Sequence, residues 1–262
     1  MGKLVRILIP LAALSAGAGC NGDVSPEARL LLEAAGDAYR AGDNQQAVQK
    51  TDAFLKDNSR SRQAGEAYYY RGRARLALGD RAGAAADLNQ AAASAQDKAI
   101  QADSLLVLGN LALDAGDASS AERLYRQSLE KDEAGRKPSD ETLYRLGCLL
   151  QKQGRWQEAD LQFDRLIYFF DGTDLAAQAG RKVRSTAWTI RTGTYAARAD
   201  AQQAGAALGL AGPLAAATRE VLEDGRLMFA VQAGRFATYD QASAALPGVR
   251  ARAKDAEVAE TR

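Results

Sequence analysis

The last third of the chain contains one motif twice, and this duplication constrains the fold more than any other feature. The first copy spans residues 188–196 and the second spans residues 229–237. Each copy alternates apolar and polar side chains, reaches a glycine (Gly193 or Gly234), places an aromatic residue two positions later, and then enters an Ala-rich run. Alternation with period two predicts a half-buried strand, and the Ala-rich runs predict helices. Each copy is therefore expected to form a strand followed by a helix.

The segments around the two copies complete an order of six elements. Two more strands are expected, one before the turn Glu223-Asp224-Gly225, which predicts a hairpin, and one after Pro247-Gly248. The elements that accompany the two motif strands are helices over residues 198–208 and 239–246 and strands over residues 214–222 and 249–254. The order β-α-β-β-α-β predicts a small domain with a four-stranded antiparallel sheet and two helices.

These paired units resemble the SPOR (sporulation-related repeat) domain over residues 187–258. The resemblance rests on the two strand–glycine–aromatic–helix units at this spacing, with the hairpin between them. SPOR domains bind bacterial peptidoglycan, in particular glycan strands stripped of their stem peptides at division sites. The resemblance therefore implies peptidoglycan glycan as the ligand of this domain.

Strand alternation assigns the side chains to two faces of the sheet. Trp188, Ile190 and Thr192 are expected to share the helix-covered face with Phe229, Val231 and Ala233. The open face should be rich in hydrogen-bond donors and poor in carboxylates, with Arg219 as a further candidate beside Arg191, Gln232, Arg250, Arg252 and Lys254. Such a face can bind sugar hydroxyls, acetamido carbonyls and carboxylates. A solvated face without a ligand is the alternative.

The family's glycan contacts lie on this same face, and the resemblance carries them to particular positions. Arg191 and Thr194 occupy positions where relatives often have Gln and Ser around the first glycine, and Met228 and Ala230 replace Trp and Arg found on the third strand of some relatives. These departures imply a shifted glycan preference or affinity. The predicted glycan-binding residues are Arg191, Thr194, Met228, Ala230, Gln232, Arg250 and Arg252.

The middle of the chain repeats with a period of 37 or 38 residues, marked by Gly42, Gly79, Gly116 and Gly154. Small residues recur seven positions before each glycine, alanines five after it, and Leu88, Tyr125 and Phe163 nine after it; Thr51 breaks the last pattern in the first copy. The pattern resembles the tetratricopeptide repeat, a helix-turn-helix unit. Four repeats are expected, stacked into a short solenoid, over residues 28–61, 65–98, 102–135 and 140–173.

In this repeat family the first helix of each unit lines a concave face that binds peptides or partner helices. The resemblance implies a partner groove at Tyr39, Tyr69, Arg73, Asn110, Tyr144 and Gln151. Each of these residues could instead be an ordinary surface residue of an amphipathic helix. A closing or linking helix is expected over residues 174–186, where Arg181, Lys182 and Arg184 suit that role or, alternatively, a contact with anionic glycan or lipid.

The N-terminus has the pattern of an export signal. Lys3 and Arg6 precede an apolar stretch too short to span a bilayer, and small residues lead to Cys20. This resembles a bacterial lipoprotein signal, although Gly17 stands where Leu is usual, and implies lipidation of Cys20 and anchoring at the periplasmic face of the outer membrane. An ordinary secretory signal cut after Ala18 is the alternative. The expected organisation is signal 1–19, linker 20–27, repeats 28–173, linking helix 174–186, SPOR-like domain 187–258 and tail 259–262.

Composition disfavours several other functions. The net charge of +1 offers no basic footprint for nucleic acid. The chain has no histidine, which excludes Ser-His, Cys-His and His-metal sites. Cys148 is expected to be a small buried helix residue. The sequence therefore predicts a non-enzymatic envelope protein without a cofactor or metal, which binds glycan and an unidentified envelope protein; a pure scaffold adaptor is the alternative.

Overall fold

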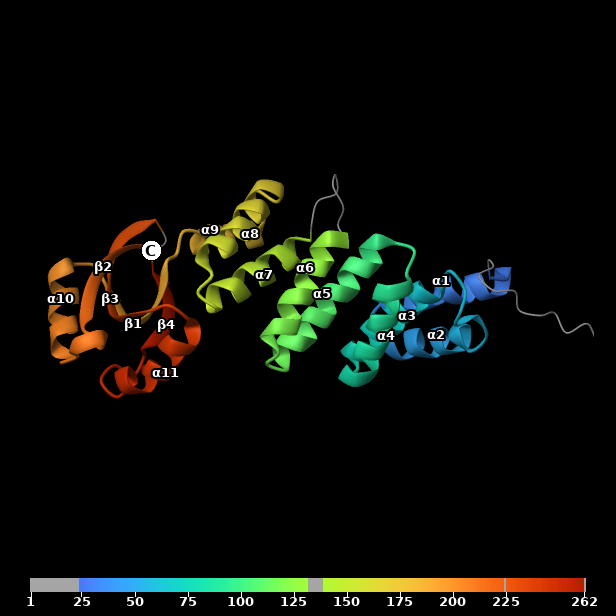
Figure 1. The fold of residues 1–262 in the computed structure, drawn as a ribbon, viewed down its shortest axis with the longest axis horizontal. Helices are drawn as coiled ribbons and strands as arrows, with labels where there is room; N and C mark the ends of the chain where they lie inside the picture. The colour runs from blue at the N-terminus through green and yellow to red at the C-terminus, as the bar shows by residue number, and fades with distance from the viewer. Residues whose placement is uncertain (1–23, 132–138, 224, 262) are drawn as a thin grey trace, which may run out of the picture. The chain divides into compact units, whose positions relative to one another are not determined.

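The computed structural model describes residues 24–131, 139–223 and 225–261, coloured along the chain in Figure 1. The described chain divides into two compact parts, one ending at Gln96 and the other beginning at Asp97. The predicted export signal and Cys20 lie outside the described residues. Within the described ranges, no helix has both the length and the apolar character needed to span a membrane.

The described residues up to Lys182 are mainly helical, as predicted. The part that ends at Gln96 contains two helix pairs, α1 (Pro26–Arg40) with α2 (Asn44–Asn58) and α3 (Ala64–Ala77) with α4 (Arg81–Ser94). The part that begins at Asp97 contains α5 (Lys98–Asp114), α6 (Ala118–Lys131), α7 (Asp140–Lys152), α8 (Trp156–Phe169) and the single helix α9 (Asp174–Lys182). Helices α5 and α6 pair with each other, as do α7 and α8.

The repeated glycines make the turn inside each helix pair. Gly42, Gly79, Gly116 and Gly154 have φ angles of +79°, +89°, +82° and +79°, a conformation that glycine adopts without steric cost. In the first three pairs, the aspartate after the glycine accepts a hydrogen bond from a backbone N–H in the first turn of the second helix. The Gly-Asp dipeptide thus ends one helix and begins the next.

Within the pairs, the small residues of the repeat pattern face the large ones. A Cβ atom added to Gly109 would lie 2.5 Å from the Tyr125 ring, and one added to Gly147 would lie 2.6 Å from the Phe163 ring. The glycines therefore let the two helices of a pair approach closely enough for the aromatic ring to fill the space. The first pair is built differently, because Thr51 is fully buried and its hydroxyl donates to the Ala47 carbonyl at 2.7 Å.

The C-terminal part of the chain forms the predicted four-stranded antiparallel sheet with two helices. Its strands have the order β2-β3-β1-β4, and α10 and α11 pack on them around a core of Ile190, Ala233, Val249 and Ala256. The elements are β1 (Ala187–Tyr195), α10 (Arg198–Ala207), a 3-10 turn (Gly212–Leu214), β2 (Ala216–Glu223), β3 (Arg226–Phe236), α11 (Tyr239–Arg250) and β4 (Glu257–Thr261). The fold class is thus as predicted.

The predicted last strand over residues 249–254 is wrong. Helix α11 continues through Pro247 to Arg250, and β4 begins only at Glu257. The helix continues past the proline because Val249, seven positions after Ala242, lies on the same helix face, and both side chains are fully buried. The alternating pattern after Pro247 therefore belongs to the last turn of a helix and a loop.

A hydrogen bond, aromatic contacts and an ion pair join the last helix pair and α9 to the C-terminal domain. The Trp188 indole N–H donates to the backbone carbonyl of Gln151 at 2.9 Å. The Trp188 ring packs against the rings of Trp156 and Tyr239, whose centroids are 5.7 and 5.1 Å away, respectively. On α9, the Lys182 ammonium pairs with the Glu260 carboxylate on β4. We call these six residues the joint. Only residues 183–186 connect α9 to β1.

Candidate functional site

The sheet has one face covered by α10 and α11 and one open face. Gln232 on β3 pairs with Ala217 on β2 and Arg191 on β1, and Arg219 on β2 pairs with Ala230 on β3. Paired residues share a face, so these side chains lie on the face that points away from the buried Ile190 and its neighbours. The faces predicted for the two motif strands are therefore correct.

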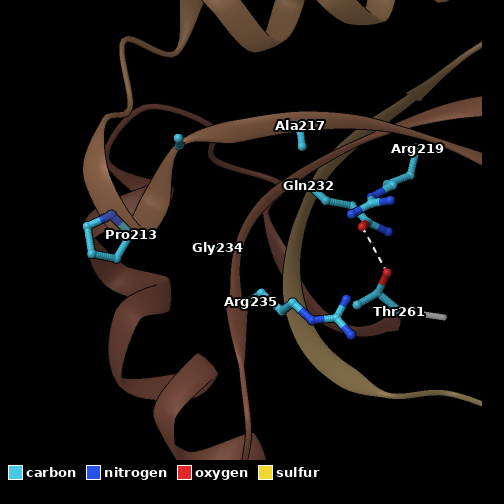
Figure 2. A pocket seen from close by; sticks show the side chains of 8 residues that line it. Pro213, Ala217, Arg219, Gln232, Gly234, Arg235 and Thr261 are labelled. Carbon is cyan, nitrogen blue, oxygen red and sulfur yellow. Dashed lines mark hydrogen bonds between the residues drawn. The ribbon is translucent and has the colours of Figure 1, made fainter.

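A hollow of about 200 Å³ opens on this face. Figure 2 shows the side chains of Arg219 and Arg235 extending toward Gln232 and Thr261. The Thr261 hydroxyl donates to the Gln232 side-chain oxygen at 3.1 Å, which leaves the amide N–H₂ of Gln232 for other acceptors. The remaining lining consists of small or rigid residues, Pro213, Ala215, Ala217 and Gly234. The volume suits one ligand group rather than a whole oligosaccharide.

Arg235 reaches the open face because of a β-bulge. Trp188 pairs with Phe236 and Ile190 pairs with Ala233, so two residues of β3, Gly234 and Arg235, stand opposite one residue of β1. Gly234 has φ +70°. Strict alternation would have placed Arg235 with Ala233 under the helices. Sequence reasoning missed this residue, although Gly234 was the signal for the bulge that turns it outward.

The other end of the open face is an ion-pair cluster. The Arg191 guanidinium bonds the carboxylates of Glu257 on β4 and Glu223 on β2, and the Thr194 hydroxyl also donates to Glu223 at 3.3 Å. A second bulge, between Arg191 and Gly193, places Thr194 opposite Ala230. Arg191 and Thr194 thus lie on the predicted face, but carboxylates neutralise the charge there. The expected shortage of carboxylates was wrong because Glu257 belongs to the strand that the sequence misplaced.

Three basic residues predicted for this face lie elsewhere. Arg250 is the last residue of α11, and its side chain donates to the Ala256 carbonyl at 2.9 Å. Arg252 and Lys254 are exposed in the loop before β4. Their predicted place on the open face is wrong, because that strand begins at Glu257. Of the two positions where relatives carry Trp and Arg, Met228 is half-buried and Ala230 is fully buried.

Three of the predicted groove residues come together in the first compact part. Tyr39 on α1 and Tyr69 on α3 stack edge to face with ring centroids 6.3 Å apart. The Arg73 side chain donates to the Tyr39 hydroxyl at 3.1 Å. All three side chains are half-buried, so each keeps some surface that another molecule could contact.

The other three groove residues make internal contacts in the second part. Asn110 accepts a hydrogen bond from Tyr125 at 2.7 Å, and Tyr144 donates to Gln178 on α9 at 3.0 Å. Gln151 is only 1% exposed and donates to the Lys182 carbonyl at 2.9 Å. The prediction that Gln151 lines an open groove is therefore wrong, because α9 covers this end of α7.

Lys182 in the joint and the nearby Cys148 have shifted pKa values. Burial would lower the pKa of Lys182, but the hydrogen bond and charge of Glu260 outweigh it, so the pKa is raised. Burial raises the pKa of the Cys148 thiol, and the nearby Lys182 charge offsets part of this increase. Cys148 packs against the core of the last helix pairs, in line with its predicted role. Among the residues that the structure describes, no three metal-ligating side chains gather in one place.

Comparisons with known proteins agree with this architecture. Residues 185–259 match the SPOR domain family, so this part of the chain is a SPOR domain. A tetratricopeptide repeat protein from Parabacteroides merdae is similar in structure, with 17% sequence identity, a TM-score of 0.50, and coverage of 60% of this chain and 58% of that chain. This likeness shows a tetratricopeptide-type fold for the helical repeats.

Two further solved structures are less similar. MamA has 20% identity and a TM-score of 0.45, with 54% of this chain and 77% of that chain covered. YrrB, described as a tetratricopeptide repeat protein with an unusual peptide-binding site, has 18% identity and a TM-score of 0.45, with 58% and 75% covered. The comparison with curated proteins gave no match.

Proposed function

We propose that the protein is a non-enzymatic component of the bacterial cell envelope that binds peptidoglycan glycan strands through the open face of its SPOR domain. The observation that carries this proposal is the hollow on that face, with Arg219, Gln232, Arg235 and Thr261 around it. Of these four residues, the first three lie within residues 185–259, which match the SPOR domain family. Guanidinium, amide and hydroxyl groups supply the donors that sugar hydroxyls, acetamido groups and carboxylates accept.

The chemistry of this face favours binding over hydrolysis. A glycosidase needs one carboxyl group that donates a proton to the leaving oxygen and a second that acts as nucleophile or base. On this face, Glu223 and Glu257 both bond the same Arg191 guanidinium. One arginine therefore holds both carboxylates in a single ion-pair cluster, and they are not placed as a separate acid and base.

The family resemblance supports a narrower ligand, glycan from which the stem peptides have been removed, as at the division septum. For the N-terminus, we propose a lipid on Cys20 that holds the protein at the periplasmic face of the outer membrane. A Cys20→Ser variant should then move from the membrane fraction to the soluble periplasmic fraction. Retention in the membrane fraction would contradict the anchor.

For the repeats, we propose that they recruit an envelope protein in cell division or wall remodelling. Support comes from the aromatic and basic cluster of Tyr39, Tyr69 and Arg73 on the first helices of two repeats. In the alternative function, an assembly scaffold, these protein contacts do all the work and the sheet binds no glycan. Fluorescence of a full-length fusion would separate the two, since glycan binding at septa predicts a ring at the division site and the scaffold alternative predicts an even envelope signal.

The direct test is sedimentation of the purified protein with peptidoglycan sacculi before and after an amidase removes the stem peptides. A fragment limited to residues 187–258 would lack most of β4, so the longer chain is needed. We expect the protein to pellet with sacculi, more after amidase treatment, and Gln232→Ala to weaken pelleting. Arg252→Ala, in the same domain but off the sheet, should pellet like the parent chain. No pelleting with either preparation would favour the scaffold alternative.

A further inference from the structure

We propose that the hollow is a carboxylate subsite in which Arg219 and Arg235 bind a free carboxylate of the glycan strand. This inference rests on the proposed glycan-binding function and specifies the ligand group within it. The carboxylate belongs to the lactyl group of a muramyl residue. When the stem peptide is attached, that group is an uncharged amide; hydrolysis of the amide leaves a carboxylate.

The first argument is the pairing of the arginines. Arg191 on the same face is engaged by two carboxylates, and Arg198 on the far side of the sheet pairs with Glu220. Arg219 and Arg235, in contrast, have no carboxylate within ion-pair distance among the described residues. Within the described residues, the one side-chain hydrogen bond of Arg235 goes to the Thr186 hydroxyl at 2.8 Å. Two guanidinium groups therefore retain donors for an added anion.

The second argument is the position of these arginines. They come from different strands, and Figure 2 shows both beside the Gln232–Thr261 hydrogen bond at one hollow. A guanidinium donates two parallel hydrogen bonds to a carboxylate, and the free N–H₂ of Gln232 can add a third donor. The small residues Ala215, Ala217 and Gly234 leave room for the lactyl group itself. The bulge at Gly234 creates this arrangement, because it turns Arg235 onto the open face.

The third argument concerns what the subsite would distinguish. A carboxylate can form charge-assisted hydrogen bonds with both arginines, whereas a peptide amide offers one neutral carbonyl oxygen and a bulky substituent. The site would therefore prefer stripped strands by charge.

The test separates charge from size with chemically matched glycans. One preparation is amidase-stripped glycan; the other is the same material after carbodiimide coupling to methylamine, which converts each carboxylate to a small neutral amide. Dissociation constants of the purified protein are measured for both by sedimentation. We expect binding about tenfold weaker for the amidated glycan, the factor that corresponds to the loss of one charge-assisted interaction.

Variants assign the effect to the hollow. Arg219→Gln and Arg235→Gln should each bind stripped glycan about tenfold more weakly and should lose most of the discrimination between the two preparations. Arg252→Gln removes the same charge from the loop before β4 and should behave as the parent chain. Circular dichroism and the melting temperature check that each variant is folded.

The outcomes distinguish the subsite from the proposed function. Equal binding of the parent chain to stripped and amidated glycan would overturn the carboxylate subsite and leave glycan binding intact. Variants that weaken binding to both preparations by the same factor would also overturn it, because the arginines would then contact another part of the sugar. No binding to any preparation, intact sacculi included, would overturn both proposals.

Discussion

The two copies of the strand–glycine–aromatic motif meet in one antiparallel ladder, and its two ends differ. At one end Trp188 pairs with Phe236, and at the other Tyr195 pairs with Phe229. The first end is covered: Trp188 is 5% exposed and contacts Trp156 and the Gln151 carbonyl on the last repeat. At the second end, Phe229 is half-buried under the Arg198 guanidinium, 5.2 Å from the ring centroid.

This difference shows how a duplicated motif acquires two uses. Both copies bring an aromatic residue to each end of the ladder and a bulge near each glycine. What lies beside each end then decides its role, because among the described residues the repeats contact the ladder at the Trp188 end. The first copy therefore joins the sheet to the helices, whereas the second copy, through Gly234, shapes the hollow on the open face.

The sharpest test of this comparison replaces the aromatic residue at each end. Trp188→Ala should lower the free energy of unfolding by about 3–5 kcal/mol, because it empties a buried space and removes the indole hydrogen bond to Gln151. Phe229→Ala should cost about 1–2 kcal/mol, because that ring is already partly in water. Urea unfolding followed by circular dichroism measures both changes. Equal losses of unfolding free energy in the two variants would contradict the assignment of the joint to the Trp188 end of the ladder.

The two glycines offer the next test. Gly234→Ala should destabilise the protein by about 1–3 kcal/mol, because φ is +70° and the new Cβ atom would lie 2.7 Å from the Phe236 ring. Gly193→Ala should cost less than about 1 kcal/mol, since its nearest neighbour is the movable hydroxyl end of Tyr195 at 3.0 Å. Gly234→Ala should also weaken glycan binding by displacing Arg235. A stable Gly234→Ala variant with unchanged binding would contradict the role of the bulge.

A smaller effect is expected from the ion pair at the joint. A double-mutant cycle with Lys182→Met and Glu260→Gln should give a coupling energy of about 1 kcal/mol near neutral pH. Because the pKa of Lys182 is raised in the folded protein, this stabilisation should be complete below the ordinary lysine pKa of about 10.4. It should be lost as the pH rises through the higher folded-state value. A coupling that persists well above that range would show that the interaction does not depend on the ammonium charge.

The smallest expected effect concerns thiol reactivity near the covered end. In a Cys20→Ser background, Cys148 should react with iodoacetamide about tenfold more slowly than an exposed cysteine at about pH 8.5, because burial raises its pKa and limits access. The matched reporter is Ala196→Cys in a chain that also carries Cys148→Ser, since Ala196 is exposed just after Tyr195. Mass spectrometry follows both rates. Similar reaction rates of the two thiols would indicate that the surroundings of Cys148 and of position 196 are equally accessible to iodoacetamide.

Much of the fold could be predicted because its signals are local. The repeated glycines adopt positive φ, and the small-to-large pairs such as Gly109 and Tyr125 pack as their spacing indicates. The last strand was misplaced for the opposite reason. Pro247 suggests a helix end, but tertiary packing of Val249 keeps that segment helical, and a single sequence does not reveal such packing.

The open face was less predictable, because its charges depend on neighbours distant in sequence. Arg191 was correctly placed, yet its partners come from two other strands, and one of them, Glu257, lay outside the predicted elements. Arg235 was missed because one bulge reverses the alternation of every later residue. Gln151 has the repeat position of a groove residue, but a helix that follows the repeats covers it.

The short connection between α9 and β1 also decides how mechanical load would pass through the protein. Residues 183–186 leave little slack, so tension between the repeats and a wall-bound sheet would enter the domain at the start of β1. This strand is bonded on both sides, to β3 and to β4. A force there must separate two ladders, whereas an edge strand would peel away from one. The topology therefore places the point of attachment on a strand suited to a tether under tension.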